Sequence, residues 1–190
     1  MTRLFLTTLI ALTLTSCSTN STNNSNNSDT TSATNSTHSN SGTNKLLTDT
    51  AKVKAWLIGV IENYTNSQDP KHAFENLKKS LTDNYYNYKQ DAINLEYDNG
   101  DTAINEQTFK KKWKDKYNIK YVGNGGFMIS AQDNGKIKVT KCTFIKNLGQ
   151  NASLYKVLIE DLDFKTKFNR DIKVVTVNNK LFIDDVIEYH

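Results

Sequence analysis

The sequence contains few of the residues that most often carry catalysis or metal binding. Its 190 residues include two cysteines, one proline and three histidines. His38 lies in a polar tract and His190 is the last residue, which leaves His72 on a helix that we expect to be exposed. Such a chain has little material for a histidine base or a zinc site. No G-x-S-x-G or H-E-x-x-H motif occurs, so we assign no catalytic or metal-binding residue and expect no cofactor.

Charge is also modest, and arginine is scarce. The formal net charge is +4, and Arg3 and Arg170 are the only arginines. A nucleic-acid-binding surface normally shows a far stronger basic bias, so no nucleic-acid partner is expected. An enzyme built from this chain would need an acid–base pair of aspartate and tyrosine. No pattern specifies such a pair, and the sequence favours a non-enzymatic function.

The chain opens with an apolar leader. Arg3 precedes the run Leu4–Leu14, which only threonines interrupt. A membrane-spanning helix needs about 20 apolar residues, so the run is too short to span and is typical of a secretory signal. The following "LTSC" resembles a bacterial lipobox. The resemblance implies that residues 1–16 are a signal peptide and that Cys17 carries acyl chains such as palmitate; the other interpretation is an ordinary secreted protein with a chance cysteine.

The same resemblance implies a location. Ser18 follows Cys17, whereas aspartate at this position tends to retain lipoproteins in the inner membrane of two-membrane bacteria. We therefore expect a cell-envelope protein, anchored by lipid in the outer membrane and facing the periplasm, with exposure at the cell surface left open. The membrane is then one partner of the chain.

A polar tract separates this anchor from the rest of the chain. Residues 17–45 are rich in Ser, Thr and Asn. The largest apolar side chain between Cys17 and Leu46 is the methyl group of Ala33. Such a segment cannot bury enough surface to offset its conformational entropy, so we expect a disordered linker. Residues 46–190 are long enough for one domain with its own core. Cys142 is the only cysteine left in this domain, so no intramolecular disulfide is expected.

Helical patterns occupy the first half of this domain. Residues 48–68 carry apolar side chains at the spacing of an amphipathic helix, with Thr48 or Asp49 as its cap. Asp69 and Pro70 are typical of the start of a second helix. Residues 82–97 predict a third helix. Residues 104–118 predict a fourth, with Phe109, Trp113 and Tyr117 on its buried face.

Alternating patterns follow after Asn118. The segments at 126–132, 136–147, 153–164, 171–177 and 180–189 predict strands. Asp133–Gly135 and Asn178–Asn179 are hairpin signals, because Asn and Gly tolerate positive φ. Helices followed by an antiparallel meander predict an α+β domain, with the helices covering one face of the sheet.

This order of elements resembles the nuclear-transport-factor-like, or cystatin-like, cone, in which an N-terminal helical hook packs on a curved antiparallel β-sheet. More narrowly, "TFKKKWKDKYN", "GNGGFMISAQDNGKIKVTKC" and "LFIDDVIEY" resemble segments of uncharacterised bacterial lipoproteins with that fold. The resemblance covers residues 48–189. It carries no activity over, because the broader fold hosts both enzymes and binding modules.

Two groups of side chains are candidates for a ligand site inside such a cone. Arg170 is the expected partner of Asp161 or Asp185, since a guanidinium binds a carboxylate through two hydrogen bonds; the alternative is a purely structural ion pair. Alternation places Asp184 and Asp185 on opposite sides of their strand, with one of them inward or at the mouth of the cone. Tyr85 and Tyr88 either line the cavity or close the rim of the core.

A lysine-rich segment is the candidate surface site. Lys110, Lys111, Lys112 and Trp113 form a possible patch for anionic headgroups, glycans or an acidic partner. The alternative is a solvated helix face with a buried aromatic edge.

Three functions remain open at this level. The first is a non-catalytic envelope lipoprotein that binds a small ligand, a glycan or a partner protein. The second is an Asp/Tyr enzyme in the cone cavity. The third is an immunity protein that neutralises a toxin at the envelope.

Overall fold

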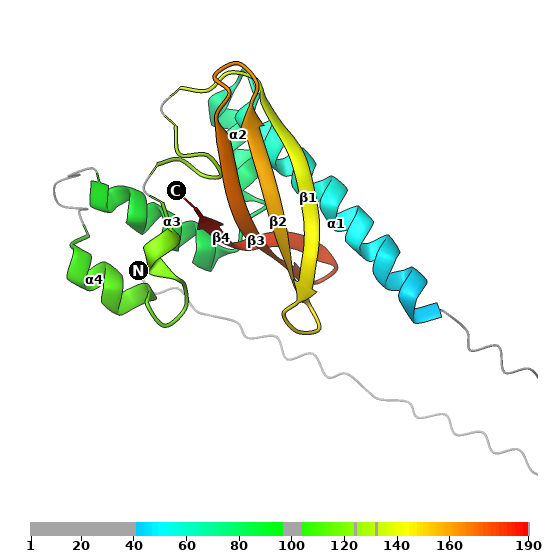
Figure 1. Cartoon of the computed structure of the whole chain (residues 1–190). Helices are drawn as coiled ribbons and strands as arrows, with labels where there is room; N and C mark the ends of the chain where they lie inside the picture. The colour runs from blue at the N-terminus through cyan, green and yellow to red at the C-terminus, as the bar shows by residue number, and fades with distance from the viewer. Residues whose placement is uncertain (1–40, 97–103, 124, 132, 190) are drawn as a thin grey trace, which may run out of the picture. The chain divides into compact units, whose positions relative to one another are not determined.

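The computed structural model describes residues 41–96, 104–123, 125–131 and 133–189. The predicted signal peptide, Cys17 and the linker up to residue 40 lie outside the described residues. The described chain has four α-helices in its first half and a meander of four strands in its second, and Figure 1 shows their arrangement. This arrangement confirms the α+β class.

The helices lie close to their predicted positions. They are α1 Ser41–Thr65, α2 Pro70–Lys78, α3 Asp83–Glu96 and α4 Glu106–Trp113, followed by a 3-10 helix at Ile119–Tyr121. Leu57 and Ile61 on α1 are fully buried, as the apolar spacing predicts. Asp69 caps α2 by accepting a hydrogen bond from the backbone N of His72 at 3.1 Å. The prediction for the start of α1 was wrong, since the helix begins at Ser41 and includes the last residues assigned to the linker.

The sheet contains four antiparallel strands in the order β1-β2-β3-β4. They are β1 Ile137–Asn147, β2 Ala152–Asp161, β3 Lys167–Val177 and β4 Lys180–Glu188. Asn178 and Asn179 connect β3 to β4 with φ angles of 51° and 60°. Two consecutive positive φ angles are the signature of a type I′ hairpin, which confirms that turn.

The fifth predicted strand, at 126–132, was wrong over its described part. Phe127, Met128 and Ile129 are all buried, whereas a strand at the edge of a sheet would alternate its side chains between two faces. Met128 has a φ of 70°, outside the extended region. Because this segment is no strand, Asp133–Gly135 is not the turn of a hairpin. It leads from the buried segment into β1.

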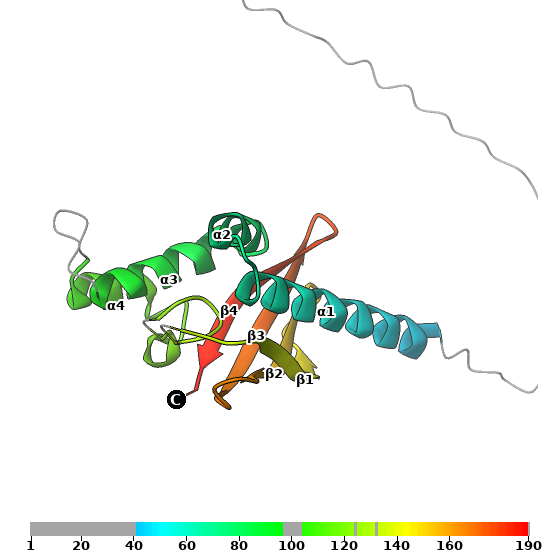
Figure 2. The ribbon, with the colours of Figure 1, turned by 90° about the horizontal axis from the view of Figure 1, so that it is seen from above.

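The helices approach the sheet at two places. Figures 1 and 2 show α1 and α2 on one face of the sheet, and α3 and α4 beyond its β4 edge. Residues 80–82 join the two parts, because Ile183 N donates to Ser80 O at 2.8 Å and Thr82 N donates to Ile183 O at 2.9 Å. The core lies between α1, α3 and the inner sheet face, where Leu57, Tyr85 and Ile172 are fully buried.

Candidate functional site

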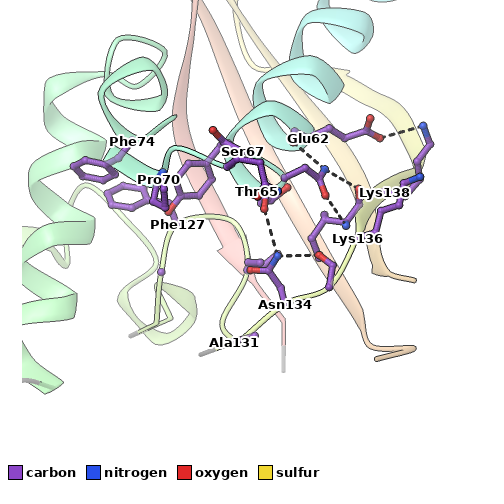
Figure 3. Close-up of a pocket in the computed structure, with 17 residues that line it drawn as sticks. Glu62, Thr65, Ser67, Pro70, Phe74, Phe127, Ala131, Asn134, Lys136 and Lys138 are labelled. Carbon is purple, nitrogen blue, oxygen red and sulfur yellow. Dashed lines mark hydrogen bonds and ion pairs between the residues drawn. The ribbon is translucent and has the colours of Figure 1, made fainter. Parts of the chain in front are cut away.

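A cleft of about 810 Å³ opens between the end of α1, the start of α2 and the segment that leads into β1. Figure 3 shows its lining side chains, which come from all of these segments. The volume lies within the range of roughly 300–1,000 Å³ that is typical of small-molecule sites. We regard this cleft as the candidate functional site.

One wall of the cleft is built by side chains of α1 and of the turn directly after it, which pair with the β1 backbone. Asn66 Nδ2 donates to Ile137 O at 2.9 Å, and Ile137 N donates to Asn66 Oδ1 at 2.8 Å. Glu62 Oε1 accepts from Val139 N at 2.9 Å and lies 3.5 Å from Lys138 Nζ. These contacts cap backbone groups along the beginning of an edge strand, which would otherwise be open to pairing with another chain. They also fix the position of this wall.

The other wall is aromatic. The Phe74 and Phe127 rings meet edge to face, with centroids 5.8 Å apart. Tyr64 also lines the cleft. Burial raises the pKa of Tyr64, against an opposing effect of its hydrogen bond with the Phe127 backbone. Half-buried aromatic surface therefore faces the polar side chains of Gln68, Asn134 and Lys136 across the same opening.

Lys136 is the one lysine of this lining that has no ion-pair partner among the described residues, since Lys138 lies beside Glu62. The Lys136 ammonium group is available to an incoming ligand. Asn134 is partly engaged, because its Nδ2 donates to Thr65 O at 3.3 Å and to Gly135 O at 3.0 Å.

The predicted pairing of Arg170 was wrong. Arg170 pairs with Glu188, at 3.4 Å, and with neither Asp161 nor Asp185. The reason is a β-bulge in β4. Opposite the β3 residues Lys173 and Val174, β4 contains one extra residue, so the pairing of the two strands shifts by one position there. Without that shift, the register set by the Asn178–Asn179 turn would place Ile187 opposite Arg170; with it, Glu188 is the opposite residue.

Glu188 also contacts a second buried cation, Lys89 of α3. Lys89, Arg170 and Glu188 are 0%, 2% and 0% exposed. Lys89 Nζ donates to Val122 O at 2.7 Å, and Ser130 Oγ donates to Glu188 Oε2 at 2.6 Å. Burial lowers the pKa of Lys89, while Glu188 opposes this shift and Arg170 adds to it. We call Lys89, Arg170, Glu188 and Ser130 the buried polar cluster.

Neither Lys89 nor Glu188 was among the predicted site residues. A signal for Lys89 was present, because it occupies the same helical stripe as Tyr85 and Ala92, at i+4 and i−3. A lysine on an apolar stripe requires a buried counter-charge. The signal for Glu188 was hidden by the bulge, because strict alternation does not reveal which residue faces Arg170.

Tyr85 and Tyr88 lie in the core. Both rings are buried, and their hydroxyls have no hydrogen-bond partner among the described residues. Tyr88 stacks on Tyr117, with ring centroids 4.3 Å apart. Burial raises the pKa of both tyrosines, with a further contribution from Glu188 to Tyr85 and from Asp185 to Tyr88. Both tyrosines belong to the core itself; the interpretation that they close its rim was wrong, because that position would leave their hydroxyls in water and both hydroxyls are buried.

The prediction that Asp184 and Asp185 lie on opposite sides of β4 was wrong, and neither belongs to the core. Ile183 and Val186, three positions apart, are both buried core residues, so the two acids between them share the outer side of the bulge. Asp184 accepts from Thr82 Oγ1 at 2.8 Å and pairs with Lys173 at 2.8 Å. Burial, with a smaller contribution from Asp184, raises the pKa of Asp185 to about 6.

Asp161 organises the turn after β2. Its carboxylate accepts hydrogen bonds from the backbone N of Gly135, Asp163 and Phe164 at 2.8–2.9 Å. Burial raises the pKa of Asp161, but these hydrogen bonds outweigh burial and hold the pKa below its usual value. Asp161 thus connects the β2–β3 turn to the segment that borders the cleft.

The predicted lysine-rich patch is only partly a surface. Trp113 is 2% exposed, and its Nε1 donates to Asp91 Oδ2 at 2.7 Å. Lys112 pairs with the same carboxylate at 2.7 Å. Lys110 pairs with Glu106, and Lys111 is exposed. Trp113 is therefore the buried aromatic edge of this helix, while the lysines remain in solvent.

Removal of Glu188 is expected to destabilise the protein more than removal of Lys89. Glu188→Leu leaves two buried cations without a counter-charge, which costs about 3–5 kcal/mol of unfolding free energy. Lys89→Met leaves Glu188 paired with Arg170 and Ser130 and costs about 1–3 kcal/mol, mainly through the unpaired Val122 carbonyl. Urea unfolding of both variants measures which loses more unfolding free energy. Equal losses would contradict an excess of positive charge in the buried polar cluster.

Neutralisation of Asp185 is expected to stabilise the protein above about pH 4, increasingly as the pH rises through 6. A pKa raised from about 3.9 in the unfolded chain to about 6 in the fold gives stability that is present below pH 4 and lost as the pH rises through 6. Asp185→Asn lacks this loss, so its advantage over the wild type should grow to about 1–3 kcal/mol by pH 8 and vanish near pH 4. Urea unfolding across this range measures it. Asp184→Asn is the control and should not stabilise the protein, because it removes the ion pair with Lys173. A stability advantage of Asp185→Asn that does not change with pH would contradict the raised pKa of Asp185.

No protein-family model matches the chain, and no curated protein or solved structure is significantly similar to it. Within the described ranges, no helix is long and apolar enough to cross a bilayer. Those ranges also hold no group of three or more His, Cys, Asp or Glu side chains placed to bind a metal ion. The arrangement of side chains described above is therefore the basis on which a function can be proposed.

Proposed function

We propose that this chain is a lipid-anchored protein of a bacterial cell envelope and that its folded domain is a non-catalytic binding module. The ligand binds in the cleft shown in Figure 3 and is a polar, ring-containing molecule such as a glycan. The finer fold that we propose is the nuclear-transport-factor-like cone. The helices before the meander, and the placement of α1 and α2 on one sheet face, support it.

The carrying observation is the chemistry of the cleft lining. Tyr64 and Phe74 offer aromatic surface, while Gln68, Asn134 and Lys136 offer amide and ammonium groups at the same opening. A sugar ring has apolar C–H faces and a hydroxyl rim, so it needs both kinds of contact at once. Mostly apolar pockets with a few placed polar groups are the usual form of small-molecule sites; this cleft is richer in polar groups than that average.

The charged groups of the core support binding rather than catalysis. Lys89, Arg170 and Glu188 satisfy one another and nearby carbonyls, and Tyr85 and Tyr88 are enclosed by apolar side chains. A general acid or base must reach the proton that it transfers. None of these five groups meets that requirement, because each is buried.

The envelope assignment depends on the leader and Cys17. Their order (Arg3, an apolar run, Ser16 and then cysteine) supports a lipidated N-terminus, and two or more acyl chains give the stable anchoring that one chain does not. The linker then holds the domain away from the bilayer.

The anchor is tested by labelling cells with a clickable fatty acid. The wild-type protein should be labelled and sediment with membranes, whereas Cys17→Ala should lose the label and leave the membrane fraction. Cys142→Ala is the matched control, because Cys142 lies half-buried on β1 and burial raises the pKa of its thiol. Equal labelling of wild type and Cys17→Ala would rule out the anchor.

The cleft is tested by calorimetric titration of the purified protein with fragments of envelope glycans. Gln68→Ala and Lys136→Glu should each weaken binding by about tenfold, the equivalent of about 1.4 kcal/mol. Lys156→Glu, an exposed site on β2 away from the cleft, should bind as the wild type does. Unchanged affinity in both cleft variants would place the ligand elsewhere, and the lack of any glycan binding would remove this ligand class.

A further inference from the structure

A second cleft lies between α3, α4 and the 3-10 helix, apart from the cleft of Figure 3. Its volume is about 530 Å³. Its apolar lining comes from all three elements and from the residue after the 3-10 helix: Ala92, Leu95, Phe109, Ile119 and Val122. Lys110, Lys120 and Glu106 complete its border. We call it the apolar cleft.

We propose that the apolar cleft binds the acyl chain of a single-chain anionic amphiphile, a long-chain fatty acid, with the carboxylate beside Lys110 and Lys120. This inference concerns a site separate from the proposed glycan cleft and does not depend on it. Its basis is an apolar interior combined with a cationic border.

The interior matches an acyl chain because it offers apolar surface without polar side chains. Ala92 and Phe109 are buried, and Leu95, Ile119 and Val122 are half-buried. An apolar chain that lies against them is removed from water, and no hydrogen-bonding group is buried without a partner. Burial of this kind is favourable. The volume also lies within the usual range for small-molecule sites, roughly 300–1,000 Å³.

The border favours an anionic headgroup. Lys120 has no ion-pair partner among the described residues, and its Nζ lies 5.1 Å from the centroid of the Tyr121 ring. Lys110 pairs with Glu106, but both side chains are mostly exposed, at 55% and 73%. Exposed ion pairs of this kind are weak, so a ligand carboxylate can compete with Glu106 for Lys110. The two lysines exceed the one acid, which leaves a net positive border.

The wall formed by Val122 and Gly123 is held in place from behind. Lys89 Nζ donates to Val122 O at 2.7 Å and to Gly123 O at 3.3 Å. Gly123 has a φ of 62°, a conformation that glycine adopts without strain. The buried polar cluster therefore holds this side of the apolar cleft in a fixed shape before any ligand arrives.

The experiment is displacement of a fluorescent fatty acid by oleate from the purified full chain that carries Cys17→Ser, without detergent. We expect saturable binding of one oleate per chain at concentrations below its aggregation threshold. Lys110→Glu/Lys120→Glu should weaken it by about tenfold, because two attractive contacts at the border become repulsive. Leu95→Trp, which fills the half-buried part of the cleft, should weaken it as well.

Lys111→Glu/Lys116→Glu is the matched control, since it makes the same charge change on the same segment outside the cleft lining. It should bind oleate as the parent chain does. All variants retain the leader, so any uptake of fatty acid by the leader is common to them. Oleyl alcohol should bind at least about tenfold more weakly than oleate, because it lacks the carboxylate that the border lysines attract.

Three results would overturn the proposal. The first is the absence of oleate binding by the parent chain. The second is equal binding by the cleft-border and control variants, which would show uptake elsewhere. The third is dimerisation in analytical ultracentrifugation that Leu95→Trp abolishes while oleate has no effect, which would assign the cleft to a second copy of the chain. Circular dichroism of each variant confirms that a loss of binding is not a loss of fold.

Discussion

The contact of Glu188 with Lys89 and Arg170 is the interaction on which the rest of the domain depends. It joins α3 to β3 and β4, and it also holds the irregular segment between α4 and β1. Lys89 binds the Val122 carbonyl, Ser130 donates to Glu188, and Arg170 Nε donates to Met128 O at 2.9 Å. Residues 122–123 and 125–130 thus keep their conformation without strand pairing. The consequence is that one side of each cleft is fixed by the same charges, because Phe127 and Ile129 line the cleft of Figure 3 while Val122 and Gly123 line the apolar cleft.

A single β-bulge makes that contact geometrically available. The extra residue in β4 shifts the register, so Glu188 rather than Ile187 lies opposite Arg170. The same extra residue turns Asp184 and Asp185 to one side, where the burial of Asp185 and the nearby Asp184 raise the pKa of Asp185. Bulges bend a strand and disrupt its ladder locally. In this sheet, one bulge brings the Glu188 carboxylate into the core. The same bulge places the Asp185 carboxylate on the outer side of β4, where burial disfavours its charged form.

Much of the fold follows from local patterns, but the polar core does not. The apolar stripe of α1, the Asp69 cap, the Asn178–Asn179 turn and the last four predicted strands are each encoded within a few neighbouring residues, and the structure confirms them. The segment at 126–132 misled because three adjacent apolar residues resemble a strand, whereas their backbone is held by distant side chains. The partner of Arg170 was missed for a similar reason, since a bulge changes which residues face each other without any change in composition. The clefts were not predicted at all, because their walls combine segments that are far apart in sequence.

The distribution of polar groups favours the binding function proposed above over catalysis. A catalytic centre needs groups whose hydrogen-bonding capacity is left free for a substrate, with pKa values set by the site. In the described core, Lys89, Arg170 and Glu188 bind one another and main-chain carbonyls, so their hydrogen-bonding groups are not free for a substrate. These contacts make the neighbouring cleft walls rigid. Rigid walls reduce the conformational entropy that a ligand must overcome when it binds. The free polar groups, such as Lys136 and Lys120, lie at the borders of clefts, where they can select a ligand by charge but have no buried partner to activate them. In the proposed binding function, the buried charges therefore act indirectly, by holding the surfaces that would meet the ligand.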